Sequence, residues 1–161
     1  LIDFDKLRKF SEIFHDSDVY GGRVAYFKNK EMTGKVSIFL SGKMISAGTK
    51  SEAQAVRELN LAKNFLLEKN LIKGIKLQPK TQNIVVSADF EENINLEELA
   101  QKSKAIYEPE QFPGAILRID QPLKASVLIF ASGKAVIAGL KNSKEIEPII
   151  QKIKELLAAI G

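Results

Sequence analysis

The sequence predicts an α+β fold in which two related half-domains each combine an antiparallel sheet with amphipathic helices. Residues 37–50 (SIFLSGKMISAGTK) and 128–141 (LIFASGKAVIAGLK) are near copies, 91 positions apart, and eight of the thirteen pairs from Ile38 to Lys50 are identical. Such a fixed-period match indicates a repeated supersecondary unit. Each copy reads as a β-hairpin, because two apolar runs flank a Ser-Gly-Lys turn. Each is followed by a segment with helical periodicity.

Composition limits the possible functions. The 161 residues contain no Cys and a single His, so disulfides, thiolate catalysis and Cys-ligated zinc are excluded. No apolar run approaches the roughly 18 residues that a membrane span needs. Residues 1–80 carry 15 basic and 9 acidic side chains, whereas residues 81–161 carry 9 and 11. The net charge of +4 mildly favours association with polyanionic partners.

The first unit opens with a predicted helix over residues 4–14, capped by Asp3 or Asp5. A polar loop ends on two glycines, and residues 23–28 form a strand candidate before the hairpin at 36–48. Ser51 then opens a long helix whose apolar stripe includes Val56 and Leu59. A Lys-rich connector follows over residues 72–80.

The second unit has the same order, with one addition at its start. Residues 82–90 (QNIVVSADF) form a β-branched strand, and Asn93 or Asn95 caps the next helix. Residues 107–114 (YEPEQFPG), a strand at 115–119, the second hairpin and a helix from Ser143 complete it. We assign residues 1–74 to an N-terminal repeat and 75–161 to a C-terminal repeat. The strand at 82–90 should have a counterpart before residue 1.

Strand alternation separates two faces of each hairpin. Val36, Ile38 and Leu40 share one face, which suits packing against a helix. The other face mixes Phe39 and Phe130 with serines and lysines, and it includes Ile45, Ala47, Val136 and Ala138 on the return strands. Two helices per unit cover only one face of a sheet, so the second face should be an exposed binding surface with Lys43, Lys50, Lys134 and Lys141 at its fringe. The competing interpretation places both Phe residues in the core.

These motifs resemble the TATA-box-binding protein family. YEPEQFPG, the strand after it and LIFASGKAVIAGLK are similar to the C-terminal repeat of that family, QNIVVSADF resembles the strand that opens this repeat, and SIFLSGK with SAGTKSEAQ resembles the N-terminal repeat. The Cys-free, Lys/Ile-rich composition is closer to archaeal members. The resemblance implies a saddle of curved antiparallel sheet with helices on the convex face. The family is itself an established example of proteins that kink DNA with apolar wedges in the minor groove.

The resemblance also implies roles for individual residues. It makes Phe112 with Phe130, and Tyr20 with Phe39, the two wedge pairs that intercalate between base steps. Asn83 and Val85 match minor-groove contacts, and Arg118 joins the four fringe lysines at phosphate-contact positions. Glu108 and Glu110 match acidic positions that meet the B-type general transcription factor, and through it the RNA polymerase machinery. No cofactor, metal or catalytic residue is implied.

Three departures from the family leave a second interpretation open. Tyr20 stands where the family has Phe, alanines stand at positions 47 and 138 where it usually has Thr, and the first strand has no counterpart. The first interpretation is an initiation factor that binds and bends A·T-rich promoter DNA. The alternative is a related protein-interaction or regulatory module with weakened DNA specificity. An archaeal protein would work in the cytoplasm at the nucleoid, and a eukaryotic one in the nucleus.

Overall fold

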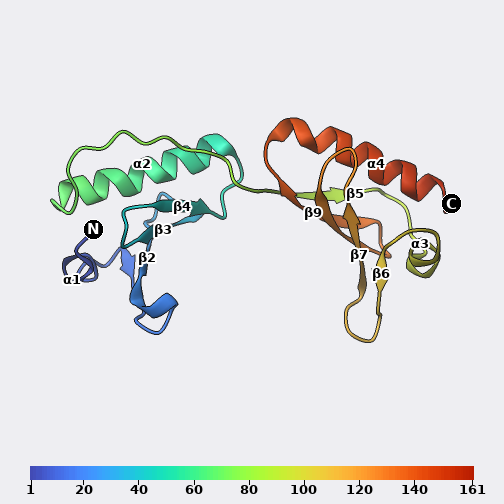
Figure 1. Cartoon of the computed structure of the whole chain (residues 1–161), viewed down its shortest axis with the longest axis horizontal. Coiled ribbons are helices and arrows are strands. Elements are labelled where there is room, and N and C mark those ends of the chain that lie inside the picture. Colours follow the sequence, from blue (N-terminus) through green and yellow to red (C-terminus); the bar gives the residue numbers. More distant parts are fainter. The chain divides into compact units, whose positions relative to one another are not determined.

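The computed structural model describes residues 1–161, which form two compact units, Leu1–Pro79 and Lys80–Gly161. Each unit combines an antiparallel sheet with helices, as the repeat predicts (Figure 1). The α+β class is therefore confirmed within each unit. The boundary predicted after residue 74 and the boundary between the compact units both lie in the connector after the first long helix.

Unit 1 contains two helices, four strands and one short 3-10 turn. They are α1 (Phe4–Leu7), β1 (Ile13–Phe14), η1 (Tyr20–Gly22), β2 (Val24–Phe27), β3 (Lys35–Phe39), β4 (Met44–Ala47) and α2 (Glu52–Glu68). The expected caps are present, because the Asp3 carboxylate accepts from the Lys6 N–H at 3.1 Å and the Ser51 hydroxyl accepts from the Gln54 N–H at 3.1 Å.

Unit 2 has the same plan with one additional strand. Its elements are β5 (Ile84–Asp89), α3 (Leu96–Lys102), β6 (Ile106–Tyr107), β7 (Gly114–Ile119), β8 (Ala125–Phe130), β9 (Lys134–Leu140), η2 (Ser143–Glu145) and α4 (Ile146–Ala158). Asn95 caps α3 by accepting from the Glu98 N–H at 3.1 Å. Asn142 and Glu145 form a capping box that starts the last helix.

The sheet orders show how the repeat is built. Unit 1 has the order β1-β2-β3-β4, and unit 2 has β5-β9-β8-β7-β6. The strands β1 to β4 therefore correspond to β6 to β9, and β5 has no counterpart in unit 1. All strand pairs are antiparallel, and Val24 pairs with Phe39 where Gly114 pairs with Phe130.

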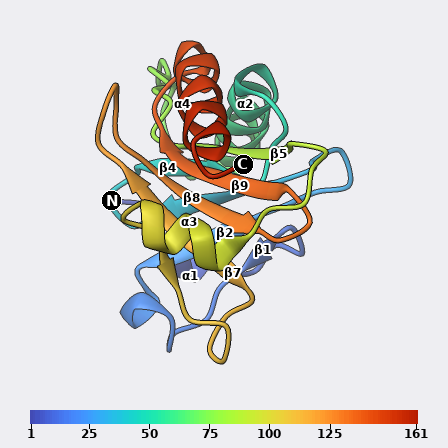
Figure 2. The same cartoon turned by 90° about the vertical axis from the view of Figure 1, so that its right-hand side faces the viewer.

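Helices cover one face of each sheet, and the core lies between them. In unit 1 the side chains of Phe27, Val36 and Ile38 are buried together with Ala62 and Leu66 of α2. In unit 2 the side chains of Val127, Ile129 and Ile137 are buried with Ile149 and Ile153 of α4. Figure 2 shows α4 lying along one face of the unit 2 sheet. The predicted division of the hairpin faces is confirmed at Val36 and Ile38.

Two helix predictions need correction. The first helix ends at Leu7 instead of Phe14, because Ile13 and Phe14 pair with Phe27 and Tyr26 as strand β1. Apolar spacing at three and four residues was therefore misleading over a segment that contains a helical turn, a bend and a strand. On α2, Val56 is 39% exposed although it was placed in the buried stripe. The buried position is Glu58 instead.

Glu58 replaces an apolar residue in the core of unit 1. Its carboxylate accepts from the backbone N–H of Thr33 at 2.7 Å and from that of Gly34 at 3.2 Å. The position of Glu58 on α2 corresponds to Ile149 on α4, at the same 91-residue offset as the hairpins. The buried carboxylate therefore ties α2 to the turn between β2 and β3, where the backbone donors would otherwise be unpaired.

No helix of the chain is long and apolar enough to span a membrane.

Candidate nucleic-acid interface

Each sheet has a face without a helical cover, which we call the open face. On β3 the buried Val36 and Ile38 alternate with the half-buried Ser37 and Phe39, and on β8 the buried Val127 and Ile129 alternate with Leu128 and Phe130. The open face of each unit therefore carries the second set of residues that the hairpin pattern predicts. In unit 1 its Ile45 is 50% exposed, and Ala47 beside it is also exposed. Val136 and Ala138 of β9 are half-buried.

The aromatic pair of unit 2 is formed on this open face. The ring centroids of Phe112 and Phe130 lie 5.8 Å apart, and the ring planes meet at 62°. Phe112 is 37% exposed, and Phe130 is half-buried beside it. The exposed edge of a rigid aromatic pair has the shape and the apolar character of a wedge.

Gly114 makes room for this pair. A Cβ atom at this position would lie 2.9 Å from the Phe112 ring and 3.1 Å from both the Phe130 ring and the Ile129 carbonyl oxygen. These distances are shorter than ordinary carbon contacts, so a side chain here would displace a ring. Glycine is therefore required by close approach at the point where β7 begins.

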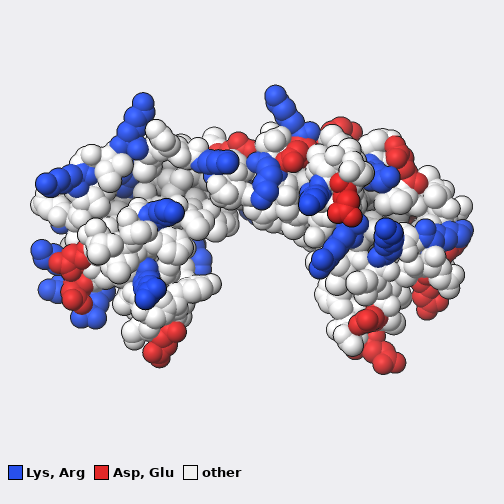
Figure 3. Space-filling view, in the orientation of Figure 1, with Lys and Arg blue, Asp and Glu red and all other residues white.

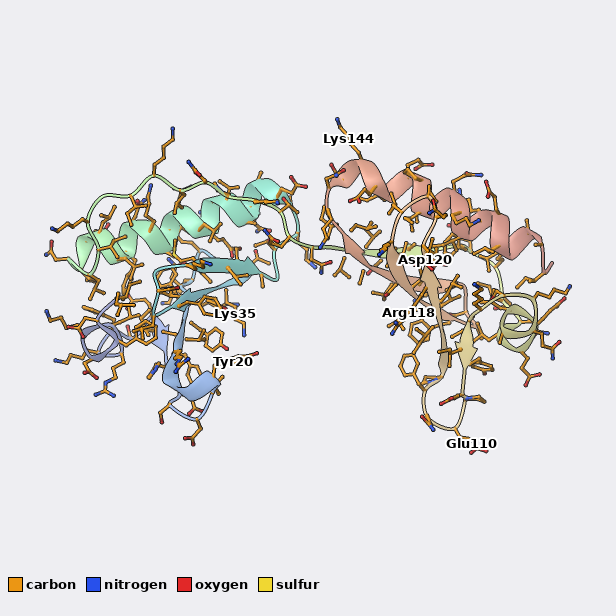
Figure 4. The ribbon with its side chains drawn as sticks, in the orientation of Figure 1. Tyr20, Lys35, Glu110, Arg118, Asp120 and Lys144 are labelled. Carbon is orange, nitrogen blue, oxygen red and sulfur yellow. The ribbon has the colours of Figure 1, made fainter.

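The corresponding pair in unit 1 is arranged differently. Tyr20, which is labelled in Figure 4, is 75% exposed with a φ of 49°. None of the aromatic contacts of the chain joins its ring to that of Phe39. The sheet register explains the difference. Nine residues (15–23) separate Phe14 from Val24, whereas seven (107–113) separate their counterparts Ile106 and Gly114. The longer loop carries Tyr20 two positions further from the strand, so its wedge role stays a prediction.

Asn83 is held in a defined orientation beside the open face of unit 2. Its side-chain oxygen accepts from the Gly139 backbone N–H at 2.9 Å, next to an irregularity in the pairing of β5 with β9. The side-chain NH₂ group is then left as a donor that has no partner within the chain. Val85 follows on β5 and is 58% exposed. This combination offers an amide donor beside an apolar surface.

The predicted phosphate-contact residues are all exposed, and none forms an ion pair. The four salt bridges of the chain involve other residues, such as Arg57 with Glu31 and Lys102 with Glu98. The residues that are exposed and form no ion pair are Lys43, Lys50, Arg118, Lys134 and Lys141. The Lys141 ammonium group donates to the Gln82 carbonyl oxygen at 2.9 Å, which holds it near Asn83. Figure 3 shows basic side chains on both units, and Figure 4 places Arg118 on β7.

The acidic residues of unit 2 occupy a different place from these cations. Glu108 and Glu110 are exposed on the loop between β6 and β7, and Glu110 lies at its tip (Figure 4). Figure 3 shows acidic side chains at the end of this loop. A carboxylate pair repels phosphate, so the tip suits a basic protein surface better than DNA.

The sequence patterns did not identify an aromatic cluster on the open face of unit 1. Phe14 and Tyr26 lie on neighbouring strands with ring centroids 6.3 Å apart, and the Lys35 ammonium group lies 4.4 Å from the centre of the Tyr26 ring. Alternation along β2 was the available signal, because Ala25 and Phe27 are buried on either side of Tyr26. Phe14 could not be placed in the same way, since its segment reads as a helix.

Comparisons with known proteins agree with this architecture. Residues 78–160 match the family model described as transcription factor TFIID, or TATA-binding protein. A TATA-box-binding protein of Cenarchaeum symbiosum is 39% identical over 82% of this chain and 72% of its own length. One from Aeropyrum pernix is 39% identical over 95% of this chain and 76% of its own length. The solved structure of Methanococcus jannaschii TBP superposes with a TM-score of 0.86 at 29% identity, covering 98% of this chain and 90% of that one.

The family match covers unit 2, and the relatives extend the similarity over unit 1. The structural match also assigns the fold, since it spans almost the entire chain. The relatives named here are archaeal, in agreement with the composition. The chain therefore belongs to the TATA-box-binding protein family, which consists of transcription factors and not of enzymes.

Proposed function

We propose that the chain binds the minor groove of A·T-rich promoter DNA, bends the duplex and so nucleates transcription initiation. One observation carries the proposal: a partly exposed, edge-to-face pair of Phe112 and Phe130 on a sheet face that no helix covers. Such a pair suits insertion between base steps, which unstacks them and kinks the duplex. The names of the relatives support the same target, since they are TATA-box-binding proteins.

The chemistry of the open faces favours A·T base pairs. In the minor groove, A·T pairs present only acceptors, whereas G·C adds the amino group of guanine. Apolar side chains such as Val85 and Ile45 lie against a groove floor without that donor at little cost, and the free NH₂ of Asn83 can donate to its acceptors. Flexible TA steps are the least costly to kink.

The unpaired cations supply the affinity that does not depend on sequence. Lys43 and Lys50 in unit 1, with Lys134, Lys141 and Arg118 in unit 2, are free to neutralise phosphates. Each phosphate contact releases counterions, so binding should weaken steeply with salt. An apolar face with a cationic rim is therefore suited to a duplex and much less to an apolar protein partner.

The test compares binding and bending on a TATA-containing duplex and on a scrambled duplex of equal composition. We expect tight binding and an increase in energy transfer between end-labelled strands on the TATA duplex alone. Phe130→Ala should remove most of the bend, whereas Ile75→Ala, which truncates an exposed apolar residue of the connector, should change nothing. Equal weak binding to both duplexes would contradict the proposal and favour a protein-interaction module.

We propose in addition that Glu108 and Glu110 contact the B-type general transcription factor, which links the complex to RNA polymerase. This proposed contact is supported by the position of both carboxylates on the exposed β6–β7 loop, with Glu110 at its tip. Glu108→Gln with Glu110→Gln should weaken the ternary complex on promoter DNA and leave the binary complex intact. Glu147→Gln with Glu155→Gln on α4 is the matched control, because both of these carboxylates are exposed away from the loop. Equal loss in both double variants would contradict this assignment.

A further inference from the structure

One row of side chains across the open face differs in chemistry between the two units. In unit 1 the sheet register aligns Phe14, Tyr26, Ser37 and Ile45 across β1 to β4. In unit 2 the corresponding row is Ile106, Ile116, Leu128 and Val136 across β6 to β9. The four-strand row of unit 2 is wholly aliphatic, and the row of unit 1 carries two hydroxyl groups at its centre. Ser87 extends the unit 2 row on β5, which has no counterpart in unit 1.

The two hydroxyl groups of unit 1 are available to a ligand. Neither the Tyr26 nor the Ser37 hydroxyl makes a hydrogen bond within the chain, and neither is a buried unpaired atom. The Tyr26 ring centroid lies 6.3 Å from that of Phe14 and 4.4 Å from the Lys35 ammonium group. Lys35 corresponds to Ser126 in unit 2, because the two residues pair with Ala47 and Ala138. Unit 1 therefore places a cation beside this row, which favours a polyanionic occupant.

A hydroxyl and an aliphatic side chain respond differently to guanine in the minor groove. The guanine amino group is a donor that an aliphatic surface buries without a partner, and an unpaired buried donor is costly. A hydroxyl can accept from that amino group, or it can rotate and donate to the N3 and O2 acceptors of an A·T pair. A row with two hydroxyls therefore accommodates both kinds of base pair.

We infer that Tyr26 and Ser37 make unit 1 the half of the protein that tolerates a G·C pair, while Ile116 and Leu128 make unit 2 the half that excludes it. The inference rests on the proposed function, since it requires both open faces to lie on the minor groove. It names specificity-determining residues on unit 1 and predicts that the two halves of the bound site have unequal sequence requirements.

The test isolates the guanine amino group. In a series of duplexes, each A·T pair of the site is replaced in turn by G·C or by inosine·C, which lacks only that amino group in the minor groove. The ratio of the two dissociation constants gives the cost of the amino group at each position. The chain has no Cys, so Gln111→Cys can carry a hydroxyl-radical cleavage reagent that reports which half-site unit 2 occupies.

The expected ratio is roughly tenfold or more beneath unit 2 and below about threefold beneath unit 1, in line with the typical cost of a wrong base pair. Tyr26→Phe with Ser37→Ala removes both hydroxyls, keeps the ring, and should raise the unit 1 ratio to that of unit 2. Tyr107→Phe is the matched control, because it removes a hydroxyl from a side chain that packs against the unit 2 core. The control should leave both ratios unchanged.

Equal ratios beneath the two units, on a protein that still prefers the all-A·T duplex, would overturn the inference and leave the proposed function standing. An unequal ratio that persists in the double hydroxyl variant would also overturn it, since Tyr26 and Ser37 would then not be its cause. Absence of any preference for the all-A·T duplex would overturn the proposed function, and this inference with it.

Discussion

Asn83 and Gly139 are joined by a hydrogen bond of 2.9 Å in which the side-chain oxygen of Asn83 accepts from the Gly139 backbone N–H. The bond fixes the orientation of the amide, because the oxygen is used within the chain and the NH₂ group is not. A donor held in place before the ligand arrives loses little conformational freedom on binding. The backbone of β9 therefore orients the amide that we propose donates to the minor groove.

Asn83→Asp tests this donor. The aspartate can still accept from Gly139, so the fold should be retained, but the donor is replaced by a charged acceptor. We expect the free energy of binding to the TATA duplex to weaken by about 1–3 kcal/mol, which is the discrimination that a good base contact usually provides. Asn64→Asp, an exposed residue of α2 that receives the same charge, is the control. Fluorescence anisotropy titrations measure both, and equal losses would show that only the added charge matters.

Gly114→Ala tests the packing of the Phe wedge. The new methyl group would meet the Phe112 ring at 2.9 Å, so we expect a displaced ring and a smaller bend in end-to-end energy transfer. Overpacking of this kind costs about 1–3 kcal/mol of stability. Gly74→Ala is the control, because nothing lies within 4 Å of that position and its φ is not positive. An unchanged bend in Gly114→Ala would contradict the proposed role of the ring pair.

Glu58→Ala tests the buried carboxylate of α2. Removing it leaves the Thr33 and Gly34 N–H groups without partners. We therefore expect the free energy of unfolding to fall by about 2–4 kcal/mol, or roughly 1–2 kcal/mol for each unpaired donor. Urea and thermal unfolding of the DNA-free chain measure this loss of stability. Glu68→Ala, at the exposed end of the same helix, should be close to neutral. Similar midpoints for both variants would mean that the carboxylate is dispensable.

The salt dependence of binding tests the cationic rim. Lys43→Ala should reduce the slope of log affinity against log salt by about 0.9, the value for one lost phosphate contact. Its effect should be the same on TATA and scrambled duplexes. Lys154→Ala is the control, since this exposed lysine lies on α4, which covers the face of the unit 2 sheet opposite to its open face. A slope unchanged by Lys43→Ala would remove that residue from the interface.

Local patterns in the sequence predicted much of each unit. Alternation along the hairpins assigned Val36 and Ile38 to the core and Phe39 to the open face, because a strand turns each successive side chain to the other side. The helix caps were predicted in part, since a short polar side chain before an apolar period has a local role. Asp3 was named together with Asp5, Asn95 together with Asn93, and Ser51 as the start of the long helix.

Features that depend on pairing between distant segments were not predicted. The two-residue strand β1 was assigned to a helix, because only its partners on β2 reveal it. The buried Glu58 resembles a solvent-facing helix residue until the turn at Gly34 is placed against it. Tyr20 aligned with Phe112 by sequence, yet the sheet register places two more residues between it and the strand. The loop before β2 is longer than its counterpart before β7, whereas the segment from Val24 to Phe39 is shorter than that from Gly114 to Phe130. These two differences nearly cancelled when the repeats were aligned by sequence.

The most direct test of the central claim, that the open faces bind the minor groove of A·T-rich DNA, replaces every A·T pair of the site by inosine·C. This substitution changes the pattern of donors and acceptors in the major groove and preserves that of the minor groove. We predict that the inosine duplex is bound and bent as well as the TATA duplex, whereas a G·C duplex is not. Loss of binding to the inosine duplex, to the level of the G·C duplex, would contradict the account.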